Sequence, residues 1–197
     1  MAAHPPNLSR LDPNLVNTPY KVQTNWHILT GAACTGKTTL IQELSTRGFN
    51  ILPESARDYF DRELARGVTL DQLMADSAAL QRNIFALQKD YERGLDPGTA
   101  AFLDRGMPDS LSFFRYWGLD PNEVLPDCFQ HCYRTVFLLD RLPLHREVTL
   151  GPEDDAASTF LDGWLERDYT SLGYRVIRVP PISLEERMKL ILQVISG

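Results

Sequence analysis

Residues 26–48 read WHILTGAACTGKTTLIQELSTRG and combine three features in one continuous stretch. The apolar segment Trp26–Thr30 has the length and composition of a buried strand. Residues 31–38 follow directly and match G-x-x-x-x-G-K-[ST], a loop whose backbone N–H groups surround phosphate oxygens. An amphipathic helix then runs to Gly48, a residue type common at helix C-termini. The stretch therefore predicts a strand, a phosphate-binding loop (the P-loop) and a helix.

The chemistry of this motif explains its spacing. The glycines let the backbone curl around a phosphate, and the helix N-terminus adds positive potential. Lys37 is expected to neutralise the β- and γ-phosphate oxygens, and Thr38 to offer its hydroxyl to Mg²⁺. We therefore expect ATP as cofactor, with GTP left open, together with Mg²⁺. The predicted nucleotide-binding residues are Gly31, Ala32, Ala33, Cys34, Thr35, Gly36, Lys37, Thr38 and Thr39.

The composition limits the number of domains, the kinds of partner and the cellular location that we expect. A chain of 197 residues, 43% hydrophobic and 23% charged, suits one domain with a single core. The net charge of −6 argues against a nucleic-acid-coating surface, because such surfaces gather Lys and Arg. We expect no membrane span and no secretion, because no apolar run is long enough and the first residues lack a secretory pattern. Three cysteines do not form a disulfide framework, so we expect a cytoplasmic location.

Short apolar runs alternate with longer helical patterns, which predicts an α/β fold with a parallel sheet. The expected strands are residues 26–30, 49–52, 100–103, 135–139 and 174–179. One long helix is expected from the spacing of Leu73, Leu80, Ile84, Leu87 and Tyr91. Ser183 and Glu186, in capping-box spacing, predict the start of a last helix.

The chain divides into three kinds of segment. Residues 1–24 are rich in Pro and Asn without a period, so we expect an irregular leader that hangs free or packs as a strap. Residues 25–197 are the expected nucleotide-binding domain. Within it, residues 142–157 are polar and aperiodic, which indicates an exposed, lid-like excursion.

The ends of two strands narrow the class of nucleotide protein. They carry Asp104-Arg105 and Asp140-Arg141, where a motor ATPase usually has Asp-Glu. Asp104 fits the metal shell, but the water-activating Glu is missing. The D-x-x-G and N-K-x-D motifs of Ras-like GTPases do not occur. The remaining pattern is that of P-loop kinases, in which arginines neutralise the transferring phosphoryl group.

Several segments together resemble a known family. They are GAACTGKTTLIQEL, ILPESARDYF, FLDRGMPDSLSFFRYWG, VFLLDRLP and LGYRVIRVPPISLEER. The chain resembles the AAA-type P-loop ATPase/kinase-like family, related to the ribosylnicotinamide kinase domain and, distantly, to deoxynucleoside kinases. The resemblance implies a doubly wound, five-stranded sheet in the order 2-3-1-4-5, with helices on both faces and the site at the carboxyl ends of the strands.

The resemblance also implies roles for individual residues. Glu54 would be a general base or metal-site partner, Asp104 a metal-shell residue, and Arg105 a brace for phosphate or for Glu54. Arg141 and Arg146 would bracket a kinase lid, although RLPLHREVTLGPEDD lacks the turn more usual in the family. The predicted catalytic residues are Lys37, Glu54, Asp104, Arg105 and Arg146, and the predicted metal ligands are Thr38 and Asp104.

Structural explanations compete with some of these roles. Glu54 is also explained as an acidic residue at a helix N-terminus, and Arg57 and Arg146 are also explained as solvated surface side chains. Asp109 fits either an acceptor's hydroxyls or a helix cap. Gln81, Arg82 and Gln88 lie where deoxynucleoside kinases read a base, or on a solvated helix face.

The sequence is consistent with two functions. The first is an ATP-dependent, Mg²⁺-requiring phosphotransferase acting on a small nucleoside-like or phosphorylated acceptor. The second is a regulatory ATP- or GTP-binding module with slow turnover that controls a partner. Neither reading involves nucleic acid, and the sequence does not indicate an oligomeric state.

Overall fold

In a computed structural model, which describes residues 5–143 and 155–196, five parallel strands form the central sheet. Its order is β3-β4-β2-β6-β7, which is the order 2-3-1-4-5 when these strands are counted along the chain. The strands are β2 (Trp26–Thr30), β3 (Asn50–Leu52), β4 (Ala101–Asp104), β6 (Thr135–Leu139) and β7 (Val176–Val179).

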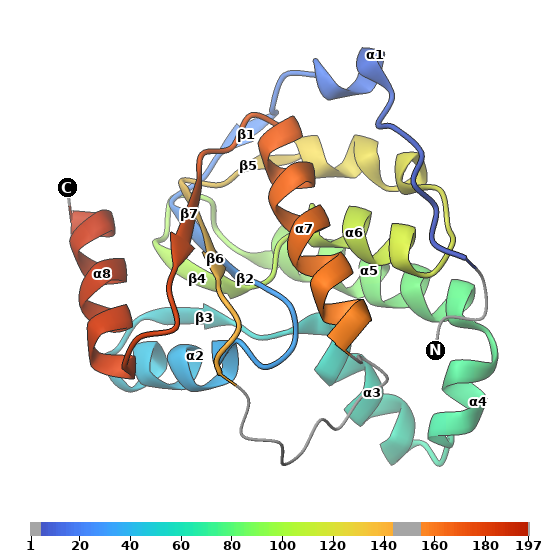
Figure 1. The fold of residues 1–197 in the computed structure, drawn as a ribbon, viewed down its shortest axis with the longest axis horizontal. Helices are drawn as coiled ribbons and strands as arrows, with labels where there is room; N and C mark the ends of the chain where they lie inside the picture. Colours follow the sequence, from blue (N-terminus) through green and yellow to red (C-terminus); the bar gives the residue numbers. More distant parts are fainter. Residues whose placement is uncertain (1–4, 144–154, 197) are drawn as a thin grey trace.

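Helices cover both faces of this sheet (Figure 1). One face carries α2 (Lys37–Thr46) and α8 (Leu184–Ser196), and the other carries α5 (Ser77–Gly94), α6 (Asp109–Tyr116) and α7 (Asp155–Ser171). Helix α3 (Ser55–Ala65) follows β3 and packs on α5, and α4 (Leu70–Ala75) precedes α5. The doubly wound α/β fold is therefore confirmed.

Successive side chains of the central strands point to opposite faces of the sheet, so an apolar layer forms on each face. Leu29 of β2 packs with Leu40 of α2 and Met188 of α8, whereas Trp26 and Ile28 pack on the opposite face. All five side chains are essentially inaccessible to solvent. Because both faces are covered, these strands are almost wholly apolar, as buried parallel strands are.

The leader is docked rather than free. Helix α1 (Pro13–Val16) and β1 (Val22–Gln23) interrupt an otherwise irregular segment. Strand β1 pairs in parallel with β5 (His131–Cys132) in a second, two-stranded sheet that the sequence did not predict. Leu11, Leu15, Val16 and Tyr20 pack against the cluster formed by α6 and the 3-10 turns Pro121–Glu123 and Leu125–Phe129.

The long helix expected from the periodicity of residues 73–91 is confirmed as α5, but the inclusion of Leu73 in it is wrong. Asp76 leaves helical geometry, and its side chain accepts a 2.9 Å hydrogen bond from the N–H of Ala79. Asp76 therefore caps α5, and Leu73 belongs to the separate helix α4. The expected capping box of α8 is confirmed, with Ser183 Oγ and Glu186 each accepting the other's backbone N–H.

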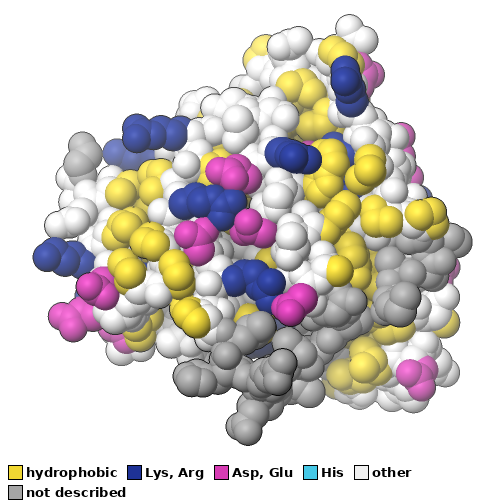
Figure 2. Space-filling view, viewed as in Figure 1, with side chains coloured by type: hydrophobic (Ala, Val, Ile, Leu, Met, Phe, Trp, Pro, Cys, Tyr) yellow, Lys and Arg dark blue, Asp and Glu magenta, His cyan; other side chains and the backbone are white. Residues whose placement is uncertain are grey.

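Charged side chains of both signs are interspersed over β7 and α7 (Figure 2). Arg178 of β7 pairs there with Asp140, Asp162 and Glu166. Among the described residues, none of the helices has the length and apolar character that crossing a membrane requires.

Candidate nucleotide-binding site

The P-loop joins the carboxyl end of β2 to the first turn of α2, as its motif predicts. Gly31, Cys34 and Gly36 have positive φ angles of 144°, 58° and 80°. A Cβ at Gly31 would lie 2.7 Å from the carbonyl oxygen of Leu139, so only glycine fits there without a shift. The loop therefore has the curled backbone that brings amide N–H groups to one side.

Lys37, at the start of α2, is held inside this loop. Its Nζ donates to the carbonyl oxygens of Gly31 (2.8 Å) and Ala32 (2.9 Å) and lies 3.3 Å from Thr35 Oγ1. Burial, followed by repulsion from Arg105, lowers the pKa of Lys37 to about 8. The amine is therefore poised beside the loop, where an anionic ligand would favour its charged form.

The metal ligands expected from the sequence can be tested against the geometry. Asp104 ends β4, beside Leu29 of β2, and is 6% exposed. Its Oδ1 is buried without a hydrogen-bond partner in the part of the chain that the structure describes. Burial, followed by repulsion from Glu54, raises the pKa of Asp104 to about 6. A buried carboxylate oxygen without a partner fits a cation-binding role.

Thr38, the second expected ligand, is exposed at the start of α2. Across residues 5–143 and 155–196, no group of three or more His, Cys, Asp and Glu side chains surrounds a metal position. Mg²⁺ usually takes one or two protein ligands and completes its shell with phosphate and water. Thr38 and Asp104 therefore fit Mg²⁺ bound together with a nucleotide.

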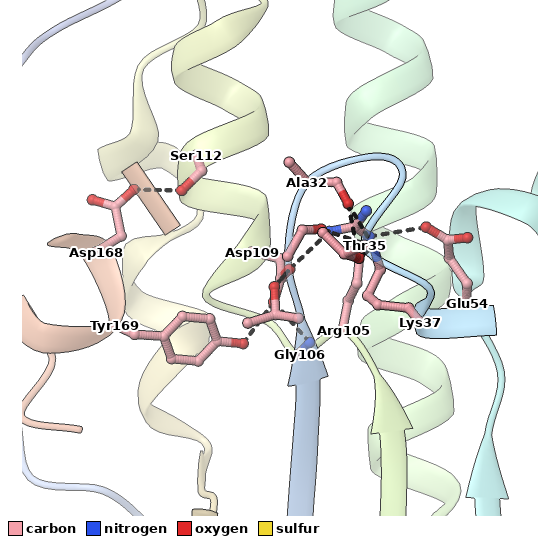
Figure 3. A network of polar contacts seen from close by, with 12 residues as sticks. Ala32, Thr35, Lys37, Glu54, Arg105, Gly106, Asp109, Ser112, Asp168 and Tyr169 are labelled. Atoms are coloured by element: carbon pink, nitrogen blue, oxygen red, sulfur yellow. Dashed lines mark hydrogen bonds and ion pairs between the residues drawn. The ribbon is translucent and has the colours of Figure 1, made fainter. Parts of the chain in front are cut away.

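Arg105 and Glu54 form the centre of the site (Figure 3). Arg105 Nε donates to Glu54 Oε1 at 2.9 Å, and Nη1 donates to the carbonyl oxygen of Gly31 at 3.1 Å. Arg105 thus joins Glu54, at the start of α3, to the P-loop. Of the two roles expected for Arg105, the structure shows the contact with Glu54.

The helix-cap role expected for Asp109 is wrong, because Asp109 is itself the first residue of α6 and its side chain caps no N–H of that helix, whereas the contact with an acceptor's hydroxyls stays a prediction. Asp109 Oδ1 accepts from Thr30 Oγ1 (2.5 Å) and Arg105 Nη1 (3.2 Å). Its Oδ2 accepts from the N–H of Gly106 (3.0 Å) and from Tyr169 Oη (2.6 Å). The carboxylate is 2% exposed, and four partners occupy it, so it braces Arg105 and the strand ends (Figure 3). Tyr169, on α7, had no local sequence signal.

A cavity of about 1150 Å³ extends from the P-loop. Residues 33–38 form one end, Glu54 and Arg105 lie between, and α3, α4, α5 and α6 form the far walls. Most of the far lining is apolar or aromatic: Phe60, Leu64, Leu70, Met74, Leu80, Ile84, Phe113, Tyr116 and Trp117. The cavity thus has a polar end for phosphate and a mainly apolar compartment beyond it.

Two glutamines of α5 line this second compartment. Gln81 is 9% exposed, and no hydrogen bond of its amide is found within the described residues. Gln88 is 3% exposed; its Nε2 donates to Glu92 Oε1 at 3.0 Å, while its Oε1 has no partner in the described ranges. They are therefore not on a solvated face. Arg82, by contrast, is exposed and pairs with Glu123.

The other residues expected at the site differ in whether the structure places them beside the cavity. Arg57 is exposed and lines the cavity, and Thr39 is exposed at the start of α2. Arg141 donates to Asp155 Oδ1 at 2.6 Å. Arg146 lies outside the described residues, as does most of the 142–157 excursion.

A family model described as an AAA domain matches residues 26–187. The chain belongs to this family. No curated protein matches the chain. The structure of NadR in complex with NAD and AMP-PNP is similar to it, with 15% identity and a TM-score of 0.62. That match covers 88% of this chain but only 50% of NadR, so the AAA-domain chain spans half of that protein.

Two kinases share the fold over nearly their whole length. Thymidylate kinase from Ehrlichia chaffeensis is 13% identical, with a TM-score of 0.62 and coverage of 89% of this chain and 99% of that one. Deoxyadenosine kinase from M. mycoides is 14% identical, with a TM-score of 0.61 and coverage of 87% and 98%. At these identities the likeness shows that the AAA-domain chain has the fold of P-loop kinases.

Proposed function

We propose that the protein is a Mg²⁺-dependent phosphotransferase that moves the γ-phosphoryl group of ATP to a small-molecule acceptor. The observation that carries this proposal is the cavity itself, which continues past the P-loop into a second compartment, with Glu54 and Arg105 at the junction. A nucleotide switch needs no such compartment. Structural neighbours that are nucleotide and nucleoside kinases support the same class of reaction.

The residues at the junction suit phosphoryl transfer to a hydroxyl group. Burial raises the pKa of Glu54, but Arg105 and Lys37 lower it more, so the pKa is lowered overall and the carboxylate is ionised. Glu54 would accept the acceptor's hydroxyl proton as the new O–P bond forms and the bond from Pγ to ADP breaks. When bound, Mg²⁺ held by Thr38 and Asp104 would neutralise charge on the β- and γ-phosphates.

Arg105 and Lys37 supply the remaining positive charge. Three contacts, to the carboxylates of Glu54 and Asp109 and to the carbonyl oxygen of Gly31, fix the position of Arg105. Burial has the largest effect on the pKa of Arg105, but Glu54, Asp109 and Asp104 together outweigh it. The guanidinium therefore stays charged at all relevant pH values. Preorganised charge of this kind stabilises a transferring phosphoryl group without reorganisation during the reaction.

The second compartment favours a nucleoside- or nucleotide-like acceptor. Its apolar and aromatic walls suit a flat, weakly polar ring, and at the edge of such a ring the Gln81 amide can donate or accept, while Gln88 Oε1, which has no partner in the described ranges, can accept. Arg57, at the cavity wall, adds a charge suited to a phosphorylated acceptor.

A phosphorylation screen of a metabolite library with Mg·ATP tests the proposal. We expect ADP formation to rise strongly with one acceptor or one narrow group, and the phosphorylated product to appear by mass spectrometry. Lys37→Ala serves as the inactive control. Slow ATP turnover that no metabolite accelerates, together with nucleotide-dependent binding of a protein partner, would instead establish the regulatory module.

A further inference from the structure

Arg187, on the first turns of α8, reaches the P-loop from behind the site. It is 2% exposed, and its guanidinium donates to three backbone carbonyl oxygens. Nη1 donates to Thr35 in the P-loop (2.5 Å), Nη2 to Asp140 after β6 (3.2 Å), and Nε to Pro180 after β7 (2.8 Å). One side chain therefore ties together the segments that follow three neighbouring strands of the sheet.

The charge of Arg187 lacks the usual compensation. Arg115, which is also fully buried, pairs with Asp168 at 3.1 Å. Arg187 makes no ion pair within residues 5–143 and 155–196, and the nearby carboxylate of Asp140 pairs with Arg178 instead. Burial accordingly lowers the pKa of Arg187, against attraction from Asp140. A buried positive charge without an acidic partner is costly unless a ligand supplies the negative charge.

The contact with Thr35 orients the backbone of the P-loop. In a trans peptide group the C=O and N–H point in opposite directions. Since the Thr35 carbonyl points at Arg187, the N–H of Gly36 points away from it. The preceding carbonyl, that of Cys34, is held in the same way by the N–H of Leu142 at 2.9 Å. Two successive peptide groups of the phosphate-binding loop are thus fixed from outside the loop.

We propose that Arg187 is a positioning residue for nucleotide binding, which orients the P-loop amide groups and adds a buried positive charge whose counter-charge is the nucleotide's phosphates. This inference rests on the nucleotide-binding part of the proposed function and not on the identity of the acceptor. A Cβ at Gly36 would lie 3.4 Å from Arg187 Nη1, so the guanidinium is directly behind the loop.

The test compares Mg·ATP binding by calorimetry in the wild type and three variants. Arg187→Met removes the charge and all three hydrogen bonds. Arg187→Lys keeps the charge but cannot reach three carbonyls in one plane. Lys189→Met removes an exposed positive charge from the same helix and is the matched control. Melting temperature and hydrogen exchange of the amides of residues 32–37 are measured for each protein.

We expect Arg187→Met to weaken Mg·ATP binding tenfold or more, Arg187→Lys to lie between it and the wild type, and Lys189→Met to stay within twofold. Exchange of the P-loop amides should rise in both Arg187 variants at temperatures where the rest of α2 stays protected. Affinities within twofold of the wild type in both variants, or a rise in exchange spread evenly over the domain, would overturn the proposal.

Two further outcomes are decisive. If Arg187→Met does not fold, Arg187→Lys carries the test, and wild-type affinity in that variant contradicts the role. Failure of the metabolite screen would refute the phosphotransferase reaction while leaving the binding comparison intact. If an acceptor is found, the KM for ATP should rise in Arg187→Lys to a value between those of the wild type and Arg187→Met, with the KM for the acceptor unchanged.

Discussion

Glu54 and Arg105 are 51 residues apart in the sequence, yet Arg105 Nε donates to Glu54 Oε1 at 2.9 Å. The pairing of β3 with β4 brings them together, since Glu54 follows β3 and Arg105 follows β4. Arg105 also has a positive φ of 74°, and its N–H donates to the carbonyl of Leu29 at 3.0 Å. The backbone therefore turns there so that the guanidinium lies between Glu54 and the P-loop.

The first prediction concerns the role of Glu54 as a base. Glu54→Gln keeps the shape of the side chain but removes its ability to take a proton. We expect kcat to fall by about 10²- to 10⁴-fold and Mg·ATP affinity to change by less than about threefold, because the carboxylate does not belong to the P-loop. Steady-state kinetics with the acceptor from the screen measure both quantities.

Asp58→Asn is the matched control for that variant. Asp58 lies one turn further along α3, pairs with Arg62 and does not line the cavity. A kcat that stays at the wild-type level in Glu54→Gln would leave Glu54 with no part in proton transfer.

The second prediction concerns Lys37. Removing one charged contact with a phosphate costs about 1.5–3 kcal/mol, so Lys37→Ala should weaken Mg·ATP binding by about ten- to 150-fold. Calorimetry measures the affinity, and Lys89→Ala, which removes a lysine paired with Asp127 elsewhere on the surface, should leave it unchanged. An affinity within twofold of the wild type for Lys37→Ala contradicts the assignment of residues 31–38 as the phosphate site.

The sequence predicted those parts of the site that are marked by a motif or pattern within one continuous stretch of chain. The P-loop joins a strand to a helix within one stretch of chain, so its motif and its context are read together. Asp104 was recognisable because it ends an apolar run, and the structure places it in the last position of β4. Parallel strands have their carboxyl ends at one edge, which is why Glu54, Asp104 and the P-loop meet there.

The parts that the sequence did not predict depend on distant partners. Asp109 could not be understood without Tyr169, which lies 60 residues further on, and Arg187 contacts a carbonyl 152 residues away. Arg187 binds backbone carbonyl oxygens, which every residue has, so no sequence motif or spacing predicts its role. The sequence does not show the break at Asp76, because the apolar period continues across it, whereas the capping hydrogen bond of Asp76 decides where α5 begins.

The third prediction is a pH dependence of stability that arises from His27. This residue of β2 is 5% exposed, and its Nδ1 has no partner in the described ranges. Burial, followed by repulsion from Arg134, lowers the pKa of His27 from 6.5 to about 4. Between pH 6.5 and 4 the unfolded chain therefore binds a proton that the folded protein does not, so stability falls as the pH falls.

The loss from this residue should approach about 3 kcal/mol near pH 4 and be absent above pH 7. Urea unfolding at several pH values measures it. His27→Gln cannot titrate, so its free energy of unfolding should fall less steeply over the same range, whatever its value at neutral pH. Parallel curves for the two proteins would mean that His27 does not titrate as its burial indicates.

The last prediction separates function from stability at Asp104. Burial and the charge of Glu54 raise the pKa of Asp104 to about 6, so above that pH the ligand-free folded protein holds a buried ionised carboxylate, which costs free energy of folding relative to the unfolded chain. Asp104→Asn removes this cost and should stabilise the ligand-free protein by about 1–3 kcal/mol at pH 7.5, measured by urea unfolding.

The same change removes a Mg²⁺ ligand, so the Mg²⁺ concentration for half-maximal turnover should rise about tenfold or more. Asp140→Asn is the control, since Asp140 follows β6, on the other side of β2 from β4, and pairs with Arg178. A variant at Asp104 with a wild-type Mg²⁺ curve would exclude this carboxylate from the metal site, whichever way its stability moved.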